Sequence, residues 1–500
     1  MDRETEAVGE REVRLAKLAA LRQMGRDPYR IERFDRSHPL QEIHDRFAEL
    51  EGKPVSVAGR VVSHRSMGKV VFVHLADATG KLQIYFRKDD LPEDWQVVEQ
   101  IDIGDLVGVH GEPFVTRTGE QSVHARRVDV LAKCLQTLPL GKEKEGHQWY
   151  GLHDREQRYR YRHLDLIANR ESYSRLVTRS KMVSAVRAFL DSEGFLEVET
   201  PVLQYEAGGA AARPFVTHHN ALGVDLKLRI SLELYLKRLL IGGIEKVYEI
   251  GRVFRNEGLS TKHLPEFTLL ELYQAYVQLE DIMTLTERLF HHVAVSCFGG
   301  PVVNVGEAEI DFSQPWRRMK LTDAIEERTG IGKEAFASLE SAKKAGESLG
   351  LDMSEETLPG GIMEKVMERF VQPHLIQPTF LTDYPLDTSP LAKKTPEDPR
   401  FVRRFEGFVM RQEVANAFSE LNDPLDQRER LTLQAAQRDA GDAEAHPMDE
   451  EFVYAMEAGM PPAGGLGIGL DRMAIVLLGA GSIRDVVFFP TLRPEAHTQS

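Results

Sequence analysis

Pairs of functional side chains two positions apart recur in segments whose composition predicts β-strands. Side chains two apart on a strand point to the same face, so each pair would share one surface. Arg255 and Glu257 form one such pair, in which the arginine could hold a phosphate and the carboxylate could accept an amino proton. Two further segments show the same spacing, with Glu271 and Tyr273 in the first and Asn416, Phe418 and Glu420 in the second.

Carboxylates on these predicted inner strands need partners, because an unpaired charge is costly to bury. Glu271 and Glu420 therefore call for a cation, and an ε-ammonium with three donors matches two carboxylates and the phenol of Tyr273. Glu406 and Glu413 form a second pair, of the oxygen type that magnesium prefers at a triphosphate. The alternative is that several of these acids only pair with lysine or arginine on neighbouring strands.

The segment GLGIGLDR, residues 465–472, reads as a glycine-rich strand that leads into a helix. Its glycines do not follow the phosphate-loop spacing, and glycine repeats alone are a weak signal. They would permit close backbone approach. Arg472, at the start of the following helix, could meet a phosphate or stack on a base.

The elements that must position these residues form one large domain. KVYEIGRVFRNE (246–257) and FTLLELYQAY (267–276) are extended segments joined by a short loop, which predicts antiparallel pairing. Further strands are predicted in RFEGFVMRQEVANAFSE (404–420). Helical spacing of apolar residues over 176–190 predicts a helix that Gly194 ends. The large domain is therefore predicted as α+β, with an antiparallel sheet flanked by helices, and not as a doubly wound parallel sheet.

Residues 53–138 show a different pattern, with five short alternating segments separated by glycine-containing turns. This is typical of a small closed barrel, and an oligonucleotide-binding (OB) barrel would stack and read bases on one strand face. The candidate base-reading residues are Arg60, Arg65, Phe72 and Gln83. Alternation alone favours a place for Phe72 in the barrel core.

The length of 500 residues predicts two or more domains. We expect a helical extension at 1–50, an OB barrel at 51–140, a charge-rich linker at 141–170 and the large domain at 171–500. The net charge of −15 argues against a general nucleic-acid coat, so any RNA contact must come from local patches.

The cellular compartment is predicted from three features that the sequence lacks: a set of paired cysteines, a signal peptide and a long apolar segment. Cys134 and Cys297 are the two cysteines, too few for a disulfide framework or a cysteine-based zinc site. The N-terminal segment has no signal-peptide pattern, and no window approaches the run of about 18 apolar residues that a membrane span needs. We expect a cytoplasmic protein that does not associate with a membrane.

Three segments resemble the motifs of the class II aminoacyl-tRNA synthetases: GFLEVETP, FRNE with the loop to HLPEF, and GLGIGLDR. Within that class the sequence is similar to the bacterial lysyl-tRNA synthetases. That similarity covers most of the chain and includes KLAALRQMGRDPY, VAGRVVSHRSMGKVVFVHLAD, GGAAARPF, ELYLKRL, HLIQPTF and SELND.

The resemblance implies an enzyme that activates L-lysine with ATP to lysyl-adenylate and transfers it to the 3′ end of tRNA(Lys). It also implies Mg²⁺ as cofactor, a homodimer, and a barrel that reads the anticodon. One alternative is a class II synthetase specific for aspartate or asparagine, against which the carboxylate-lined pocket speaks. Another is a non-catalytic tRNA-binding paralogue. Against that alternative speaks the joint presence of Arg255, Glu257, Glu406, Glu413 and Arg472.

The resemblance further implies which residues bind ATP. Arg255 would hold the substrate carboxylate and the α-phosphate, and Glu257 and His263 would contact ATP. Phe267 would stack on adenine, and Arg472 would close over adenine and the γ-phosphate. Arg255, Glu257 and Arg472 would thus form the catalytic set.

For lysine, the resemblance implies contacts to each part of the substrate. The α-amino group would be received by Gly209 and Glu233. The ε-ammonium and the stem would be received by Glu271, Tyr273, Glu420, Asn416 and Phe418. Glu406 and Glu413 are similar to the family's magnesium ligands.

One stretch departs from the family pattern. Ala415 and Ala417 stand where the family has glycines, and residues 410–412 replace a glycine-rich turn. Two added methyl groups would take up space beside the lysine stem or ATP, and overpacking of this kind costs about 1–3 kcal/mol.

Overall fold

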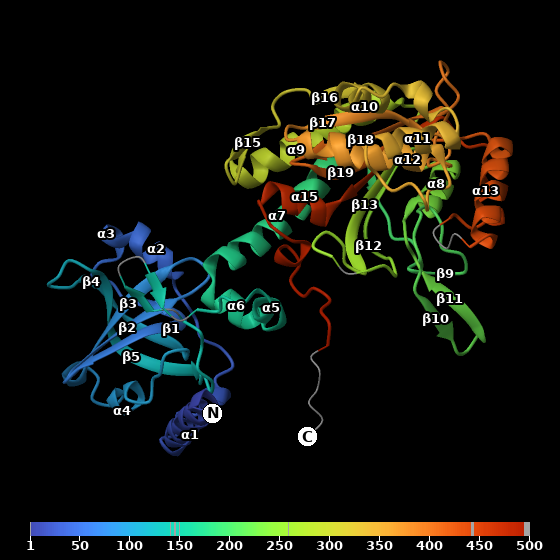
Figure 1. Ribbon diagram of the computed structural model, residues 1–500. Coiled ribbons are helices and arrows are strands. Elements are labelled where there is room, and N and C mark those ends of the chain that lie inside the picture. The colour runs from blue at the N-terminus through green and yellow to red at the C-terminus, as the bar shows by residue number, and fades with distance from the viewer. Residues whose placement is uncertain are drawn as a thin grey trace. The chain divides into compact units, whose positions relative to one another are not determined.

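A computed structural model describes residues 2–140, 142–144, 147–149, 151–258, 260–441 and 445–494. The chain divides into two compact units, Met1–Asn169 and Arg170–Ser500. In Figure 1 the first unit runs from blue to cyan-green and the second from green to red. No helix among the described residues is long and apolar enough to cross a membrane.

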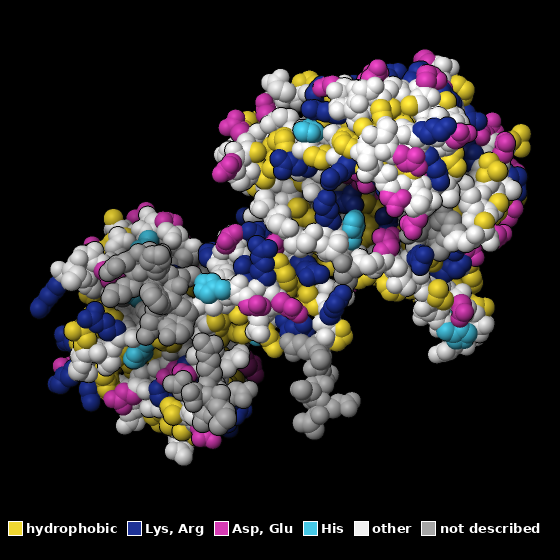
Figure 2. Space-filling view, in the orientation of Figure 1, with side chains coloured by type: hydrophobic (Ala, Val, Ile, Leu, Met, Phe, Trp, Pro, Cys, Tyr) yellow, Lys and Arg dark blue, Asp and Glu magenta, His cyan; other side chains and the backbone are white. Residues whose placement is uncertain are grey.

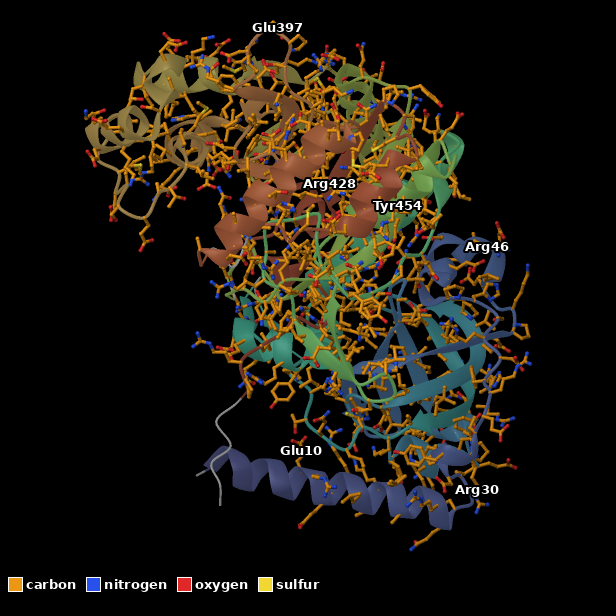
Figure 3. All side chains as sticks on the ribbon, turned by 90° about the vertical axis from the view of Figure 1, so that its right-hand side faces the viewer. Glu10, Arg30, Arg46, Glu397, Arg428 and Tyr454 are labelled. Carbon is orange, nitrogen blue, oxygen red and sulfur yellow. The ribbon has the colours of Figure 1, made fainter. Side chains whose placement is uncertain are left out.

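The first unit is built round a closed barrel with the strand order β1-β2-β3-β5-β4. The neighbours are antiparallel except β3 and β5, which are parallel. The strands are β1 (Val55–Met67), β2 (Val70–Ala76), β3 (Lys81–Arg87), β4 (Leu106–Val115) and β5 (Gln121–Ala132). The helices are α1 (Asp2–Gln23), α2 (Leu40–Asp45), α3 (Phe47–Leu50) and α4 (Trp95–Val98), with single 3-10 turns at Pro28–Arg30 and Lys88–Asp90. The predicted five-stranded barrel is confirmed, and Figure 3 shows α1 as a long helix that leads towards Arg30.

Alternation along β2 explains which side chains fill this barrel. Val71, Val73 and Leu75 are buried in its core, and the residues between them are only half-buried. Because strand side chains alternate, Phe72 lies on the outer face. The expectation that Phe72 lies in the barrel core is therefore wrong.

The predicted linker at 141–170 lies partly outside the described residues. Its described part contains two very short strands, β6 (Lys142–Lys144) and β7 (His147–Trp149). It also contains two helices, α5 (Arg155–Arg160) and α6 (Arg162–Ala168). Asp154 caps α5 by accepting a hydrogen bond from the backbone N–H of Gln157, which explains why a charged segment forms a helix here.

The second unit centres on an eight-stranded sheet in the order β16-β17-β18-β19-β20-β13-β12-β8. The strands are β8 (Leu196–Glu197), β12 (Lys246–Phe254), β13 (Glu266–Ala275), β16 (Arg317–Lys320), β17 (Thr379–Pro385), β18 (Phe401–Val409), β19 (Gln412–Ser419) and β20 (Ala463–Gly469). The inner strands are antiparallel, as predicted. The two edge pairs, β16 with β17 and β12 with β8, are parallel, so the sheet is mixed. The edge strands β16 and β8 have only four and two residues, and alternation along a strand does not record whether its neighbour runs parallel or antiparallel.

Three helices cover one face of this sheet and form its main hydrophobic core: α7 (Arg170–Ser192), α9 (Leu279–Phe298) and α15 (Leu470–Leu477). Gly194 follows α7 with a φ of +80°, in agreement with the predicted helix end. The remaining helices are α8 (Glu233–Ile241), α10 (Leu321–Thr329), α11 (Leu339–Ser348), α12 (Pro359–Val366), α13 (Pro424–Asp439) and α14 (Glu450–Glu457). Smaller strands are β9 (Leu203–Gln204), β10 (Val216–His219), β11 (Val224–Leu228), β14 (Val302–Val305) and β15 (Ala308–Asp311). Figure 3 shows α13 and α14 side by side, marked by Arg428 and Tyr454.

Candidate active site

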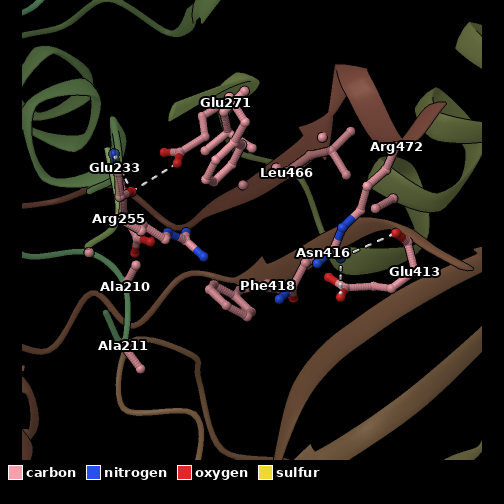
Figure 4. A pocket seen from close by; sticks show the side chains of 18 of the residues that line it. Ala210, Ala211, Glu233, Arg255, Glu271, Glu413, Asn416, Phe418, Leu466 and Arg472 are labelled. Carbon is pink, nitrogen blue, oxygen red and sulfur yellow. Dashed lines mark hydrogen bonds and ion pairs between the residues drawn. The ribbon is translucent and has the colours of Figure 1, made fainter. Parts of the chain in front are cut away.

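A cavity of about 360 Å³ opens on the sheet face opposite the main core. Figure 2 shows a hollow on the larger unit, with Lys, Arg, His and acidic side chains gathered round its mouth. Of the residues predicted for the large domain's site, all but Glu406 line this cavity. In Figure 4, Glu233 and Glu271 lie towards one end, Arg472 and Glu413 towards the other, and Asn416 and Phe418 between them.

Strand register brings the predicted residues together. On β20, Gly467 pairs with both Glu271 of β13 and Asn416 of β19, and Gly465 pairs with Tyr273 and Phe418. A Cβ on Gly465 would lie 2.0 Å from Glu420 Oε1 and 2.5 Å from Tyr273 Cε1. The glycine-rich strand therefore leaves room for the side chains of its two neighbours, which is the close approach that the sequence predicted.

Arg255 and Glu257 do not lie on a strand, which corrects one prediction. β12 ends at Phe254, so both residues follow it in a loop. The Arg255 guanidinium lies over the Phe267 ring, 5.1 Å from its centroid, and its Nε donates a long 3.4 Å hydrogen bond to the Ile230 carbonyl. Its terminal nitrogens have no hydrogen-bond partner among the described residues. Burial lowers the pKa of Arg255, and an anionic ligand would offset that cost.

Glu271 has neutral partners only. It accepts hydrogen bonds from Ser231 Oγ at 2.8 Å, from the Leu232 backbone N–H at 3.2 Å and from the Tyr273 hydroxyl at 3.3 Å. Burial, with the nearby charge of Glu233, raises the pKa of Glu271 to about 7. No lysine or arginine within residues 151–258, 260–441 and 445–494 forms an ion pair with it.

Glu420 is fully buried, and its partner is a residue that the sequence analysis missed. Lys237 Nζ lies 2.5 Å from Glu420 Oε2 and 2.5 Å from Glu233 Oε1. The contact to Glu420 is an ion pair but is poorly aligned, so neither Glu420 oxygen accepts a well-formed hydrogen bond within the described chain. Burial raises the pKa of Glu420 to about 8 despite Lys237. The alternative that these acids pair with a lysine or arginine of the protein itself is therefore correct for Glu420 and Glu233, but not for Glu271.

The three acids and Lys237 leave two negative charges unmatched when all are ionised. Glu271 and Glu420 hold protons near pH 7 in the free site, and a ligand with two ammonium groups could displace both. The four-residue spacing of Glu233 and Lys237 in one helix could have revealed half of this network. His446 was missed too; it lines the cavity, and burial lowers its pKa to about 4, so it is neutral.

Glu406 and Glu413 are paired with arginines. Arg404 Nη2 lies 2.5 Å from Glu406 Oε1, and Arg472 Nη1 lies 2.7 Å from Glu413 Oε2. Tyr384 also donates a 2.9 Å hydrogen bond to Glu406. Burial and the charge of Glu413 raise the pKa of Glu406 to about 8, so the two carboxylates interact. Arg404 lies two residues before Glu406 on β18, a spacing that the sequence analysis overlooked.

Arg472, in the first turn of α15, completes the far end of the cavity as the glycine-rich motif predicted. Its Nη2 lies 3.4 Å from His263 Nε2, and burial lowers the pKa of His263. Glu257 is exposed at the cavity rim. Arg472 and His263 thus offer one cation and one neutral ring at this end.

The two alanines affect the lysine stem less than expected. Ala417 is buried in the helix-side core and does not line the cavity, because alternation on β19 turns it away from Asn416 and Phe418. Ala415 belongs to the same core and also borders the cavity. The expected crowding therefore reaches the cavity at Ala415 alone.

The β18–β19 turn carries backbone strain. Met410 and Arg411 have φ values of +50° and +65°, in the left-handed region that two-residue hairpin turns need. Hydrogen bonds hold the turn: the backbone N–H groups donate to the Ile376 and Leu375 carbonyls, and Arg411 Nε donates to Pro373.

Arg411→Val is expected to destabilise the larger unit by about 1 kcal/mol, since a β-branched residue tolerates this conformation poorly. Urea unfolding would show a lower midpoint with an unchanged slope. Gln412→Val is the matched control, because Gln412 lies on β19, where valine is favoured. Equal losses in both variants would contradict a strained turn.

The outer face of the barrel carries the predicted base readers. Arg65 pairs across β1 and β2 with Phe72, which pairs with Tyr85 of β3; the Phe72 and Tyr85 rings lie 5.2 Å apart. Gln83 is buried, and its amide already bonds Glu120 and Ser122. Arg60 lies elsewhere on β1 and donates to the Gly104 carbonyl at 2.7 Å. Arg65 and Phe72 are thus the two candidates that the structure places together.

Comparison with known proteins adds two family matches. Residues 154–493 match the tRNA synthetases class II (D, K and N), and residues 55–131 match the OB-fold nucleic acid binding domain. The lysine–tRNA ligase of Pelotomaculum thermopropionicum is 52% identical over 485 residues, covering 96% of this chain and 94% of the relative. Those of Syntrophomonas wolfei and Bacillus subtilis are 50% and 48% identical, covering 97% and 96% of this chain and 97% of each relative.

These matches confirm the predicted fold class of an N-terminal OB barrel and a class II domain. The class II match covers well over half of the chain, and the relatives match it over nearly their whole length. The segments that resemble the second and third class motifs meet at the cavity, through Arg255 and Arg472. The chain therefore belongs to the class II tRNA synthetases, in the family of bacterial lysine–tRNA ligases.

Proposed function

We propose that this enzyme uses ATP to activate L-lysine as lysyl-adenylate and then transfers the lysyl group to the 3′ end of tRNA(Lys). The observation that carries the lysine assignment is the pair of buried carboxylates Glu271 and Glu420, of which Glu271 has no cationic partner in the described chain and Glu420 shares Lys237 with Glu233. Neither an acidic nor an amide substrate would neutralise them. A site built for an ammonium rejects neutral analogues strongly, because they leave its buried polar groups unpaired.

Lysine would bind along the row from Glu233 to Phe418. Its ε-ammonium would lie between Glu271, Tyr273 and Glu420, and its stem would pack on Phe418 beside Asn416. Its α-ammonium would bind Glu233 near Gly209. Gly209 has a φ of +85° and lies against Ser231 and Glu233, so a side chain there would clash with this corner.

Activation would begin with attack of the lysine carboxylate on the α-phosphorus of ATP. A new oxygen–phosphorus bond forms, the bond to the β-phosphate oxygen breaks, and pyrophosphate leaves. Arg255 would hold both the carboxylate and the α-phosphate, Phe267 would stack on adenine, and Arg472 would close from the other side. Glu257 and His263 would contact ATP at the rim. Positioning and charge neutralisation accomplish this step without a dedicated base.

Transfer would follow by attack of the terminal ribose 3′-hydroxyl of tRNA on the lysyl carbonyl. The new ester bond forms, the bond from the carbonyl carbon to the phosphate oxygen breaks, AMP leaves, and the hydroxyl proton is released to solvent. Arg255 would hold the phosphate of the departing AMP. The family is generally dependent on ATP and magnesium, which is consistent with both steps.

Magnesium would be held by Glu413 on the cavity wall, with Glu406 behind it. The pair fits a divalent cation in charge, because the charge of Glu413 raises the cost of ionising Glu406 and a cation between them would lower it. Arg472 would exchange Glu413 for a phosphate when ATP enters. Bound magnesium supplies charge neutralisation at the triphosphate.

The barrel would read the anticodon. The outer face around Phe72 is aromatic, with Tyr85, Phe114 and His124 in mutual ring contact at 5.1–5.6 Å between centroids. Such faces stack unpaired bases. Arg65 would contact the RNA there, whereas Gln83 and Arg60 would first have to exchange their present partners.

We also propose a homodimer that works in the cytoplasm, where its tRNA and ATP are found. Apolar side chains that are 40–64% exposed gather on segments around β8 to β10: Leu196, Val202, Leu203, Tyr205 and Val216. Exposed apolar patches of this kind mark interaction surfaces.

Amino-acid-dependent exchange of pyrophosphate into ATP tests the substrate. Lysine should support exchange at least about 1,000-fold better than aspartate or asparagine, since either would leave buried charges unpaired. The three amino acids should be compared at equal concentration with the same enzyme. Exchange with aspartate but not lysine would overturn the assignment, and exchange with none would favour the non-catalytic alternative.

A further inference from the structure

Lys237 stands behind the amino-acid site rather than in it. Its side chain is fully buried in α8 and does not line the cavity, yet Nζ lies 2.5 Å from both Glu233 and Glu420. Those two residues are the proposed partners of the α-ammonium and the ε-ammonium. Within the described chain, Lys237 is the one cation in ion-pair contact with either of them.

The surroundings of Lys237 keep it charged. Burial alone lowers the pKa of Lys237, but Glu233 and Glu420 outweigh burial, and the pKa lies above its ordinary value. Nζ also lies 5.7 Å from the centroid of the Tyr273 ring and 6.0 Å from that of Phe452 on α14. The nearest titratable groups on the surrounding elements are Glu233, Glu271, Tyr273, Glu420 and the neutral His446.

A structural role alone explains this arrangement poorly. A buried ion pair is weak evidence for stability, because apolar residues of similar volume often do as well. Lys237 also cancels only one of the two negative charges of Glu233 and Glu420. The remaining negative charge suits a site that binds a cationic ligand.

We propose that Lys237 is a positioning residue of the amino-acid site, which holds the Glu233 and Glu420 carboxylates together and cancels one of the site's three negative charges. The site is thereby matched to a substrate with two ammonium groups. This inference rests on the proposed lysine activation and adds a residue to it that does not touch the substrate.

Removal of the charge should weaken lysine binding in a pH-dependent way. Without Lys237, Glu233 and Glu420 repel each other, so one of them keeps a proton to higher pH. Lysine must then displace an additional proton. In the wild-type enzyme, the KM for lysine should fall as pH rises through about 7 to 8, where Glu271 and Glu420 ionise. In Lys237→Met this fall should move upward by about one pH unit.

The test compares Lys237→Met with the wild-type enzyme in pyrophosphate exchange between pH 6.5 and 8.5. At pH 7 we expect the KM for lysine to rise about 100-fold, with the KM for ATP within about twofold. Lys246→Met is the matched control, because Lys246 bonds the Glu193 carbonyl and lies over the Phe195 ring, outside the cavity. Its KM for lysine should stay within about twofold of wild type.

Two more variants separate charge from shape. Lys237→Arg keeps the cation and should keep the wild-type pH profile. Lys237→Met with Glu233→Gln removes the repulsion and should return the pH profile to the wild-type range, although affinity stays low. Equal changes in the KM for lysine and ATP, or an unmoved pH profile in Lys237→Met, would overturn the proposal. Failure of the wild-type enzyme to use lysine would instead reject the proposed function.

Discussion

Arg255→Ala is expected to lower the rate of lysine-dependent pyrophosphate exchange by about 1,000-fold, because one charge that stabilises the transition state is lost. The Arg255 guanidinium is mostly buried, lies over Phe267, and has terminal nitrogens without partners in the described chain. Negative charge develops on the phosphate oxygens as pyrophosphate leaves, and Arg255 is placed to meet it. The loss should fall mainly on kcat.

Arg255→Lys sharpens this test. Lysine keeps the charge but lacks the planar fork that can hold a carboxylate and a phosphate together, so activity should be intermediate. Arg252→Ala is the matched control, since Arg252 is an exposed arginine near the end of β12, three residues before Arg255, and does not line the cavity. Its rate should remain within about twofold of wild type. Exchange within tenfold of wild type in Arg255→Ala would remove Arg255 from the catalytic set.

Local patterns in the sequence predicted the barrel and the sheet strands β12, β13, β19 and β20, but not β17. Once those strands are placed, hydrogen-bonded register fixes which side chains meet. Glu271 and Asn416 share the partner Gly467 for this reason. The glycine-rich segment was predictable in role as well, because only a residue without a side chain leaves space for Glu420 beside Tyr273.

What could not be predicted depends on contacts between distant segments. The pairing of Lys237 with Glu420 joins a helix to the end of a strand far along the chain, and no periodicity records such a contact. The outward position of Phe72 was missed because alternation gives two faces but does not say which one is inside. The places of Arg255 and Glu257 in a loop depend on where β12 ends, and strand ends are the least predictable part of an element.

The same limits apply to the acids at the ATP end. Glu406 and Glu413 were predicted from residue type and from the family resemblance, yet each forms an ion pair with an arginine in the structure, Arg404 and Arg472. The position of a carboxylate in the sequence does not show which arginine or lysine will form an ion pair with it in the folded protein. A charge network of this kind stays satisfied without ligand, and it can exchange partners when phosphate enters.

Glu420→Gln is expected to raise the KM for lysine by about 100- to 1,000-fold, since it removes one member of a buried charge pair. Glu420 is fully buried, and an amide cannot neutralise the ε-ammonium or balance Lys237. The KM for ATP should change by no more than about twofold, because Glu420 lies at the amino-acid end. Glu340→Gln is the control, since Glu340 is also paired with a lysine but is exposed on α11, where such a pair contributes little.

The pH dependence provides an independent measure of the same residue. In the wild-type enzyme, raised pKa values of about 7 for Glu271 and about 8 for Glu420 mean that the free site holds protons at neutral pH. Lysine displaces them, so its affinity should increase with pH over this interval and then level off. Glu420→Gln should lose the upper part of the increase and keep the part that belongs to Glu271. Because a merely misfolded pocket would weaken binding at every pH alike, the loss of only the upper part places the Glu420 carboxylate against the substrate's ammonium. Equal loss of lysine and ATP affinity would place it outside the amino-acid pocket.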